Sequence, residues 1–230
     1  MKKHLFGCLT IIGLFSISTF AELKPFSVAV KGGIGLATLW GNNSQDSMGM
    51  VPAFRSGFYG GLSGAFQFSE FFAVQLECLY SMKGKSITGY YDSYTKDISY
   101  KLDYCELPIT IRYSVPISPI SDFFVFAGPN ISYRISAIKD SSIYWIQSDA
   151  KMPDSSTNIQ SQTNPFDFGI TLGGGMAIDA GPGEILFDVR YTFGLVSIDK
   201  LTDAEKNKGA KQLDLKNSHV GFMLGYQIKF

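Results

Sequence analysis

Apolar and polar residues alternate along many stretches of this chain. From Val220 to Phe230 every second residue is apolar, whereas the positions between them hold residues such as Gly221, Gln227 and Lys229. A period of two over such a length is typical of a β-strand with one apolar face. The same pattern predicts strands over 167–178, 184–193, 74–81 and 104–113, and less regular strands over 26–36, 58–68 and 124–134. Together these stretches predict eight strands.

The links between these stretches alternate in length. The short links are turn-forming and cover 69–70, 116–121 and 180–183. The long links are polar and cover 38–55, 84–99, 137–165 and 196–216. Outer-membrane barrels have short turns at the periplasmic rim and long loops at the outer rim. The sequence therefore predicts an all-β fold, an eight-stranded antiparallel up-and-down transmembrane β-barrel, with both chain termini on the periplasmic side.

The period of two does not by itself decide which face of the barrel is apolar. A soluble lipocalin-like barrel places its apolar file inside and its charged file in water. Three features favour a membrane barrel. The polar files hold many Gly, Ala and Ser residues beside Glu and Arg, which makes them too small and polar for a dry ligand cavity. Aromatic residues gather near strand ends, where interfacial belts belong, and the chain stops on the aromatic strand residue Phe230.

The N-terminus has the organisation of a secretory signal peptide. A basic start is followed by an apolar stretch over 9–20 that ends at the small residue Ala21. This stretch is shorter than the roughly 20 residues of a spanning helix. We therefore expect residues 1–21 to be removed and residues 22–230 to form the outer-membrane barrel domain. Cys8 precedes the apolar stretch instead of following it, so a lipoprotein is the less favoured interpretation.

Composition and charge narrow the classes of partner. Phe, Tyr and Gly are abundant, and charged residues make up 17% of the chain. After Ala21 the chain has no apolar run long enough for a transmembrane helix. The formal net charge is zero, and removal of the basic N-terminus leaves a slightly acidic chain. We therefore expect no nucleic-acid partner.

Several charged residues fall in the polar files of the predicted strands. They are Glu77, Glu106, Arg112, Arg134, Asp167, Asp188 and Arg190. A charge on the lipid face costs about 2 to 4 kcal/mol near the midplane, so these side chains are expected to point inward. An eight-stranded barrel has just enough room for side chains, and pairs of Arg and carboxylate would fill its lumen. The alternative is a narrow gated ion path.

The hairpin that carries Glu77 and Glu106 gives two finer expectations. If this hairpin is symmetric, the two carboxylates face each other and Arg112 is the first choice for the cation beside them. The same symmetry places Cys78 opposite Cys105 on the lipid face. The compartment permits a disulfide, but cross-strand geometry is often poor for one, so we expect two free thiols.

A hydrolase or an acyltransferase is the competing enzymatic interpretation, since Ser218, His219 and Asp214 could form a nucleophile, base and acid set. Adjacent strand residues point to opposite faces, however, so Ser218 and His219 cannot readily share a site. We interpret His219 as a rim residue of the lumen file. Two mature cysteines and scattered histidines also argue against a metal. We expect neither an enzyme activity nor a cofactor.

Short motifs occur in order on successive predicted strands. They are Glu77-Cys78-Leu79-Tyr80 with Lys83-Gly84, Glu106-Leu107-Pro108, Phe126-Ala127-Gly128-Pro129, and Asp188-Val189-Arg190-Tyr191 with Gly194-Leu195. This succession resembles the PorT-like outer-membrane β-barrel family of Bacteroidetes, over essentially the whole mature chain. The resemblance implies an outer-membrane barrel whose closing strand, with Tyr226, Ile228 and Phe230, carries the signal for the barrel assembly machinery. The namesake of that family is linked to a protein secretion and gliding apparatus.

The long links are the remaining candidates for a binding function. The link over 137–165 contains Tyr144-Trp145 among Ser, Asp, Asn and Gln, and residues 89–100 alternate Tyr with Asp, Ser and Lys. Such residues on a rigid barrel can bind a glycan, a protein or another cell, or can be mobile loops that keep the rim soluble. We expect a structural or surface-interaction role, with outer-membrane lipid, the assembly machinery and a surface ligand or protein as partners. The alternatives are a small-solute or ion channel and an accessory component of a secretion apparatus.

Overall fold

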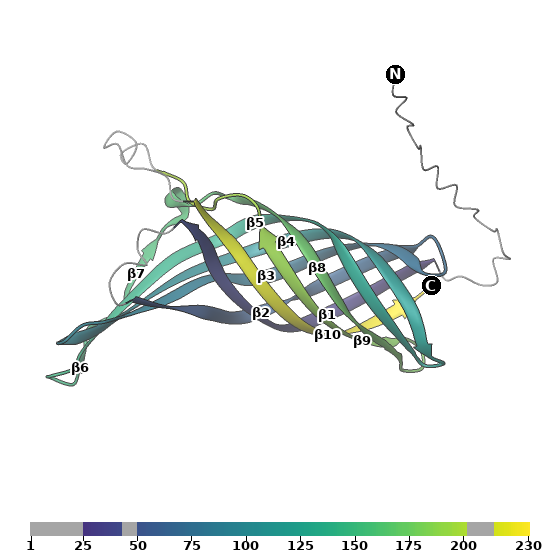
Figure 1. Ribbon diagram of the computed structural model, residues 1–230, viewed down its shortest axis with the longest axis horizontal. Helices are drawn as coiled ribbons and strands as arrows, with labels where there is room; N and C mark the ends of the chain where they lie inside the picture. Colours follow the sequence, from purple (N-terminus) through teal and green to yellow (C-terminus); the bar gives the residue numbers. More distant parts are fainter. Residues whose placement is uncertain (1–24, 43–49, 202–213) are drawn as a thin grey trace, which may run out of the picture.

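The computed structural model describes residues 25–42, 50–201 and 214–230. Among these residues, eight long antiparallel strands form a closed ring (Figure 1). They are β1 (Phe26–Asn42), β2 (Met50–Gln67), β3 (Phe72–Tyr90), β4 (Tyr94–Ser118), β5 (Ser121–Trp145), β8 (Phe166–Asp179), β9 (Glu184–Gly194) and β10 (Asp214–Lys229). Each of them pairs with the next one along the chain, and β10 pairs with β1 to close the ring. The predicted up-and-down barrel is confirmed.

The connection between β5 and β8 contains smaller elements. They are β6 (Ala150–Lys151), β7 (Ser155–Asn158) and the 3-10 helix η1 (Gln160–Gln162). Both β6 and β7 pair with the end of β5. In the part of the chain that the structure describes, no helix has the length and hydrophobicity to cross a membrane. The predicted signal peptide over 1–21 lies outside the described residues.

The outer surface of the ring is apolar, as strand β10 illustrates. Phe222, Leu224 and Ile228 are 37%, 61% and 40% exposed, whereas Met223 and Gln227 between them are 2% and 5% exposed. Successive side chains of a strand point to opposite faces, so the apolar file covers the outside and the mixed file lines the lumen. A soluble barrel has the reverse arrangement. The apolar outside therefore matches a barrel surrounded by lipid.

Aromatic rings gather at both ends of the apolar surface. The pairs at the short-turn end are Phe26 with Phe66, Phe68 with Phe72, and Phe72 with Tyr113, with ring centroids 5.1, 6.2 and 5.0 Å apart. The pairs at the opposite end are Trp40 with Phe193 and Tyr133 with Phe166, with centroids 4.7 and 5.3 Å apart. Two levels of aromatic rings are typical of the two interfaces of an outer-membrane barrel.

The turns between β2 and β3, β4 and β5, and β8 and β9 are short, as predicted. In the last of them Gly181 has a φ of 84°, a conformation that glycine adopts without steric cost. Its N–H donates to the Asp179 carboxylate at 3.0 Å. At the same rim the Phe230 N–H donates to the carbonyl of Phe26 at 2.7 Å. This hydrogen bond ties the end of the closing strand to the start of β1.

Strands β3, β4 and β5 are longer than predicted and continue past the rim of the ring (Figure 1). They have 19, 25 and 25 residues, whereas β9 has 11. The prediction of a loop over 84–99, and over the first part of 137–165, is therefore wrong. The predicted loops over 38–55 and 196–216 are also too long, since β1 reaches Asn42, β2 begins at Met50 and β10 begins at Asp214. Hydroxyl and charged side chains on both faces of these strand ends weaken the period-two signal. We call this extended sheet, residues 84–101 and 138–158, the protrusion.

A β-bulge marks the level at which the protrusion leaves the ring. The pairing of β4 with β5 shifts between Asp103 and Tyr104, where Ile135 is the extra residue on β5. A bulge adds one residue to a strand and re-aims the side chains beyond it. On β5 the next buried residue after Arg134 is accordingly Ala137, three positions on, because Ile135 is the extra residue. The lumen face of the ring therefore continues onto one face of the protrusion.

The register of the β3–β4 hairpin differs from the symmetric register predicted. Glu106 pairs with Leu79, two residues beyond Glu77, so the prediction that Glu77 and Glu106 face each other is wrong. The same offset separates Cys78 from Cys105. The cause is the turn after β3, which lies one residue further along the chain than that symmetry requires. Both thiols are free, with their Sγ atoms 3.9 Å apart on the outer face.

Candidate functional site

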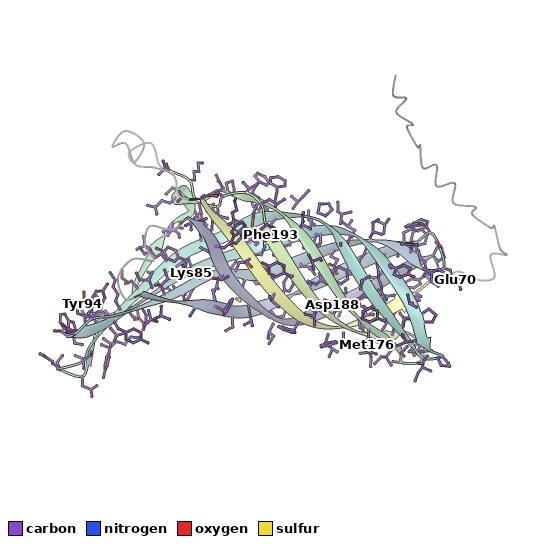
Figure 2. All side chains as sticks on the ribbon, in the orientation of Figure 1. Glu70, Lys85, Tyr94, Met176, Asp188 and Phe193 are labelled. Carbon is purple, nitrogen blue, oxygen red and sulfur yellow. The ribbon has the colours of Figure 1, made fainter. Side chains whose placement is uncertain are left out.

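The middle of the lumen holds four charged side chains in mutual contact. Arg190 and Asp188 lie on β9, Glu77 on β3 and Lys31 on β1, and each belongs to the lumen-facing file of its strand. Figure 2 marks Asp188 in the middle part of the barrel. Arg190 Nη1 is 2.5 Å from Glu77 Oε2, and Arg190 Nη2 is 2.9 Å from Asp188 Oδ2. Lys31 Nζ lies 3.0 Å from Glu77 Oε1 and 3.1 Å from Asp188 Oδ2. We call these four residues the central quartet.

The central quartet is electrically neutral and enclosed. Each of its side chains has 1% or less of its surface exposed. Buried charges are tolerated when they are paired and hydrogen-bonded, a condition that two cations and two carboxylates meet here. The Arg190 guanidinium carbon also lies 5.0 Å from the Phe126 ring centroid and 5.7 Å from that of Tyr59. Side chains therefore fill the lumen at this level.

A second polar cluster lies beside the central quartet. Lys83 Nζ is 2.7 Å from Glu106 Oε1, and Asn130 donates to Glu106 Oε2 at 2.9 Å. The His219 ring packs edge-on against Tyr59 with centroids 4.5 Å apart. His219 is 1% exposed, and neither of its ring nitrogens has a hydrogen-bond partner among the described residues. His219 thus belongs to the lumen file, as predicted, but it lies buried against Tyr59 and not at the rim.

Glycines on the lumen side make room for these large side chains. A Cβ at Gly221 would lie 2.6 Å from the Tyr59 ring and 3.2 Å from Arg190 Cγ. A Cβ at Gly35 would lie 2.0 Å from His219 Nε2. Neither approach is sterically possible without a shift of the neighbour. The frequent Gly in the polar files is therefore part of how an eight-stranded barrel accommodates Tyr, Arg and His in its lumen.

A hydrophobic cluster closes the lumen at the end that carries the protrusion. It consists of Leu102, Tyr104, Ala137, Ile159 and Ile198, all buried. Ile159 and Ile198 come from connections that the sequence analysis treated as polar loops. Arg134 fastens the first of these connections by donating to the carbonyls of Gln160 and Thr163, both at 3.1 Å. We call this cluster, with residues 159–163, the cap.

The short-turn end of the lumen contains a cavity of about 160 Å³. Arg112 on β4 lines it and donates to Ser114 Oγ at 3.1 Å and to Gln227 Oε1 at 3.4 Å. Its guanidinium carbon lies 3.8 Å from the centroid of the Phe124 ring. Among the described residues, no carboxylate lies within ion-pair distance of Arg112. Arg112 is therefore solvated by neutral partners at the mouth of this cavity.

The interpretation of Arg112 as the cation beside Glu77 and Glu106 is wrong. Glu77 is neutralised by cations on β1 and β9, as described above. Glu106 on β4 is neutralised by Lys83 on β3. Arg112 lies about 20 Å further along β4 than Glu106, at the rise of a strand, and this separation exceeds the reach of the side chain. Although Arg112 and Glu106 lie on the same face of β4, this did not identify the cations that pair with the two glutamates.

Asp167 and Arg134 also line the lumen, but with neutral partners. Asn217 Nδ2 donates to Asp167 Oδ2 at 2.7 Å and to Tyr104 Oη at 3.2 Å. The guanidinium of Arg134 binds backbone carbonyls of the cap. The expected pairing of arginine with carboxylate is found at Arg190 but at neither Arg112 nor Arg134. Each predicted lumen residue is buried, yet the seven residues belong to separate clusters and not to one network.

Sequence reasoning missed Lys31, Lys83 and Tyr59, which contribute directly to these clusters. A signal for Lys31 was available, because it alternates with the apolar residues Val28 and Val30 on β1. Lys83 continues the inward file of β3, but the predicted strand ended at residue 81. Tyr59 lay in a strand whose alternation is irregular. Extension of the period of two to the true end of β3 would have found Lys83, whereas Lys31 already lay inside the predicted strand over 26–36.

The far end of the protrusion carries exposed aromatic side chains. Tyr91 stacks on Tyr94 with ring centroids 4.5 Å apart, and Tyr94 contacts Trp145 at 5.2 Å. Figure 2 shows Tyr94 at the end of the sheet that lies farthest from the ring. Tyr90 and Tyr144 beside them are 65% and 42% exposed. We call these five residues the aromatic tip.

The outward face of the protrusion is polar and internally paired. Thr88 Oγ1 donates to Asp97 Oδ1 at 2.7 Å, and Lys101 Nζ lies 2.6 Å from Asp140 Oδ2. The hydrogen bond from Lys101 holds the pKa of the Asp140 carboxyl below its ordinary value. These residues continue the outer face of β3, β4 and β5. Closer to the short-turn rim, the same outer face is apolar. The change from apolar to polar marks where a surrounding bilayer ends.

The chain is similar to known outer-membrane proteins. Residues 17–200 match a family described as outer membrane protein beta-barrel domain. No curated protein matches the sequence. Among solved structures, Neisserial surface protein A is 13% identical with a TM-score of 0.46, over 89% of this chain and 97% of that one. OprG from Pseudomonas aeruginosa is 11% identical with a TM-score of 0.48, over 90% and 98%. Ail of Yersinia pestis is 10% identical with a TM-score of 0.35, over 89% and 99%.

Proposed function

This chain belongs to the outer membrane protein beta-barrel domain family, and from that premise we propose that it is a closed barrel that anchors an extracellular binding surface. The protein resides in the outer membrane, as its family and its apolar outer surface indicate. Barrels of this kind keep their short turns in the periplasm. We therefore assign the short-turn rim to the periplasm and the protrusion to the cell exterior.

The observation that carries the proposal is the length of β3 beyond the apolar surface. Its outward file is apolar through Leu76, Cys78, Tyr80 and Met82, and then becomes polar. The strand continues to Tyr90, which adds about 26 Å at the rise of an extended chain. Beyond Lys83, which pairs with Glu106 in the lumen, this length forms ladders with β2 and β4 that extend past the rim of the ring. A role in contacting another molecule accounts for it.

The aromatic tip supports the same role. Tyr and Trp supply large contact areas at a low cost in side-chain entropy, and they are enriched in binding hot spots. Tyr91 stacks on Tyr94, and Trp145 makes a tilted contact with Tyr94, so the three rings hold one another in place before any partner arrives. A binding surface with this order loses less conformational entropy on association.

The filled lumen argues against the channel alternative. The central quartet and the cap close the bore at two levels, while conduction needs a continuous water path. We accordingly favour an anchor over a pore and propose no enzymatic site, since Ser218 bonds Tyr191 on the outer face, at 2.9 Å, away from His219.

Site-specific crosslinking on intact cells tests the proposal. A photo-crosslinking residue at Tyr94 should give a discrete adduct with a component outside the cell envelope or on its surface. The matched control is Leu224, which is exposed on the apolar outer surface and should give lipid adducts. Failure of both Tyr94 and Trp145 to give any discrete adduct would contradict a binding role for the protrusion.

We further propose the finer assignments that the resemblance implies, a PorT-like barrel of Bacteroidetes with a C-terminal assembly signal, and the cleaved leader that the N-terminal pattern indicates. N-terminal sequencing of the mature protein should begin at Glu22. Removal of the Phe230 aromatic ring by Phe230→Ala should reduce the yield of the heat-modifiable, assembled form. A role as an accessory component of a secretion apparatus would require a barrel or periplasmic partner in crosslinks from the periplasmic rim, for example from Glu70.

A further inference from the structure

One face of the protrusion forms a groove of about 310 Å³. Strands β4, β5 and β7 form its floor, and η1 forms one wall. Its polar lining consists of Lys96, Lys139, Ser141, Ser155, Thr157 and Gln162. The cross-strand pairs Lys139 with Thr157 and Ser141 with Ser155 put these side chains on one face, the face that continues the lumen side of the ring. The groove thus lies outside the membrane and above the cap.

Charge is segregated between the two faces of this sheet. The opposite face has its own hollow, which Asp97, Asp140 and Asp154 line together with Lys101 and Lys151. There each lysine has a carboxylate partner, Lys101 with Asp140 and Lys151 with Asp154. The lining of the groove includes no carboxylate. On the opposite face of the sheet, carboxylates therefore neutralise the lysines. On the face that forms the groove, the lysines leave the lining basic.

Neither Lys96 nor Lys139 has an ion-pair partner within the described ranges. Lys139 Nζ lies 5.5 Å from the centroid of the Tyr100 ring, which orients the ammonium without cancelling its charge. Lys139 pairs across the ladder with Tyr100, and Lys96 lies further along β4 toward the aromatic tip. Four residues of a strand separate the two levels, about 13 Å. Two ammonium groups with this spacing suit a polymer with charges at intervals better than one small anion.

We propose that this groove binds an extracellular acidic polysaccharide that carries sulfate or phosphate esters. The two lysines would contact successive ester groups, and Ser141, Ser155, Thr157 and Gln162 offer hydroxyl and amide groups for the sugar hydroxyls. The absence of carboxylates from the lining removes the repulsion that an acidic chain meets on the opposite face. This proposal deepens the proposed function, on which it rests, by naming the ligand class of the protrusion.

Titration calorimetry on the full-length protein in detergent micelles tests the proposal, with a heparin-derived hexasaccharide as the probe. The same hexasaccharide with its sulfates removed, inorganic sulfate, and a single-stranded oligonucleotide of equal charge serve as comparison ligands. The test variant is the double substitution Lys96→Gln and Lys139→Gln. The matched control is Lys101→Gln with Lys151→Gln, which removes the same charge from the opposite face. Heat-dependent gel mobility verifies that both variants fold.

We expect the wild type and the control variant to bind the sulfated sugar within about twofold of each other, and the test variant to bind at least about tenfold more weakly. Binding should weaken as salt is raised, because exposed charges are screened. Equal losses in the two variants, equal binding of the desulfated sugar or the oligonucleotide, saturation by inorganic sulfate alone, or no binding by the wild type would each overturn the proposal. A Tyr94 adduct on cells that persists in the Lys96 and Lys139 variant would leave the binding role of the protrusion standing.

Discussion

Arg190 on β9 donates to both carboxylate oxygens of Glu77 on β3, with distances of 2.5 Å from Nη1 and 3.3 Å from Nη2. The two residues are 113 positions apart in the chain, and β1, β2 and β10 lie between their strands in the ring. The ion pair therefore spans the lumen and links opposite walls of the barrel. Because Lys31 and Asp188 join the same contact, any change to one member acts on the whole central quartet.

Substitution of Arg190 by methionine should strongly destabilise the barrel. Glu77 and Asp188 would keep Lys31 as their shared cation, which leaves one buried negative charge uncompensated. Loss of one partner of a buried pair costs about 3 to 5 kcal/mol. The measurement is the free energy of unfolding in denaturant, in detergent or lipid. The double variant Glu77→Met with Arg190→Met retains the neutral pair of Lys31 and Asp188, so it should lose less stability than Arg190→Met alone. A double variant that is the less stable of the two would show that charge balance is not what holds the quartet.

Addition of one methyl group at Gly221 should also destabilise the barrel. The new Cβ would lie 2.6 Å from the Tyr59 ring, which is fixed between Arg190 and His219. Overpacking of this kind costs about 1 to 3 kcal/mol. Gly64→Ala is the matched control, because its Cβ would meet its nearest neighbour, the Ser27 carbonyl oxygen, at 4.0 Å. Thermal gel-shift midpoints should fall for Gly221→Ala and stay constant or rise slightly for Gly64→Ala. A fall of equal size in both would contradict a packed lumen.

The wild-type protein should show no stable unit conductance in a planar bilayer. Arg134→Ala removes the side chain that fastens the cap to Gln160 and Thr163, and it should loosen the cap. Because the central quartet closes the bore at a separate level, this variant should remain silent as well. Reproducible conductance steps in the wild type would restore the channel alternative. Steps in Arg134→Ala alone would show that the cap, and not the quartet, is the barrier.

Cysteine labelling should report the orientation of the barrel. In a background where Cys78 and Cys105 are alanine, Ser93→Cys in the turn between β3 and β4 should react with a membrane-impermeant maleimide on intact cells. Ser69→Cys, in the short turn between β2 and β3, should react after the outer membrane is permeabilised. The two positions belong to opposite ends of β3. The reverse pattern would invert the assignment of the protrusion to the cell exterior.

The strands and their faces could be predicted from the sequence because alternation is local. The file from Val220 to Phe230 is apolar at every second position, and its side chains face outward in the barrel. The short turns likewise follow from Gly, Pro and Ser between two such files. The predicted ends of strands were less accurate. On β3 the alternation of apolar and polar residues stops at the membrane boundary, but the hydrogen-bonded ladder continues to Tyr90.

The partners of the lumen residues could not be predicted in the same way. Whether a side chain points inward follows from its place in the alternation along the strand. This alternation correctly predicts that Glu77, Arg112 and Arg190 point toward the interior. The choice of partner depends on the stagger of the strands, on the position of the turn after β3 and on the reach of each side chain. Arg112 pairs with Ala73, four residues or about 13 Å along β3 from Glu77. Lys31 on β1 and Arg190 on β9 reach Glu77 across the lumen instead.

The sequence by itself therefore determined an all-β chain with an apolar file and a polar file on each strand, because period two is a property of neighbouring residues. It also determined the apolar file of the closing strand from Val220 to Phe230. The tertiary structure decided what closes the lumen, namely the central quartet, the glycine-lined space around Tyr59 and the cap, because each brings together strands that lie far apart in the chain. It also decided that part of the predicted loops is a sheet. Cross-strand pairing gives this sheet one basic face and one face on which lysines and aspartates are paired.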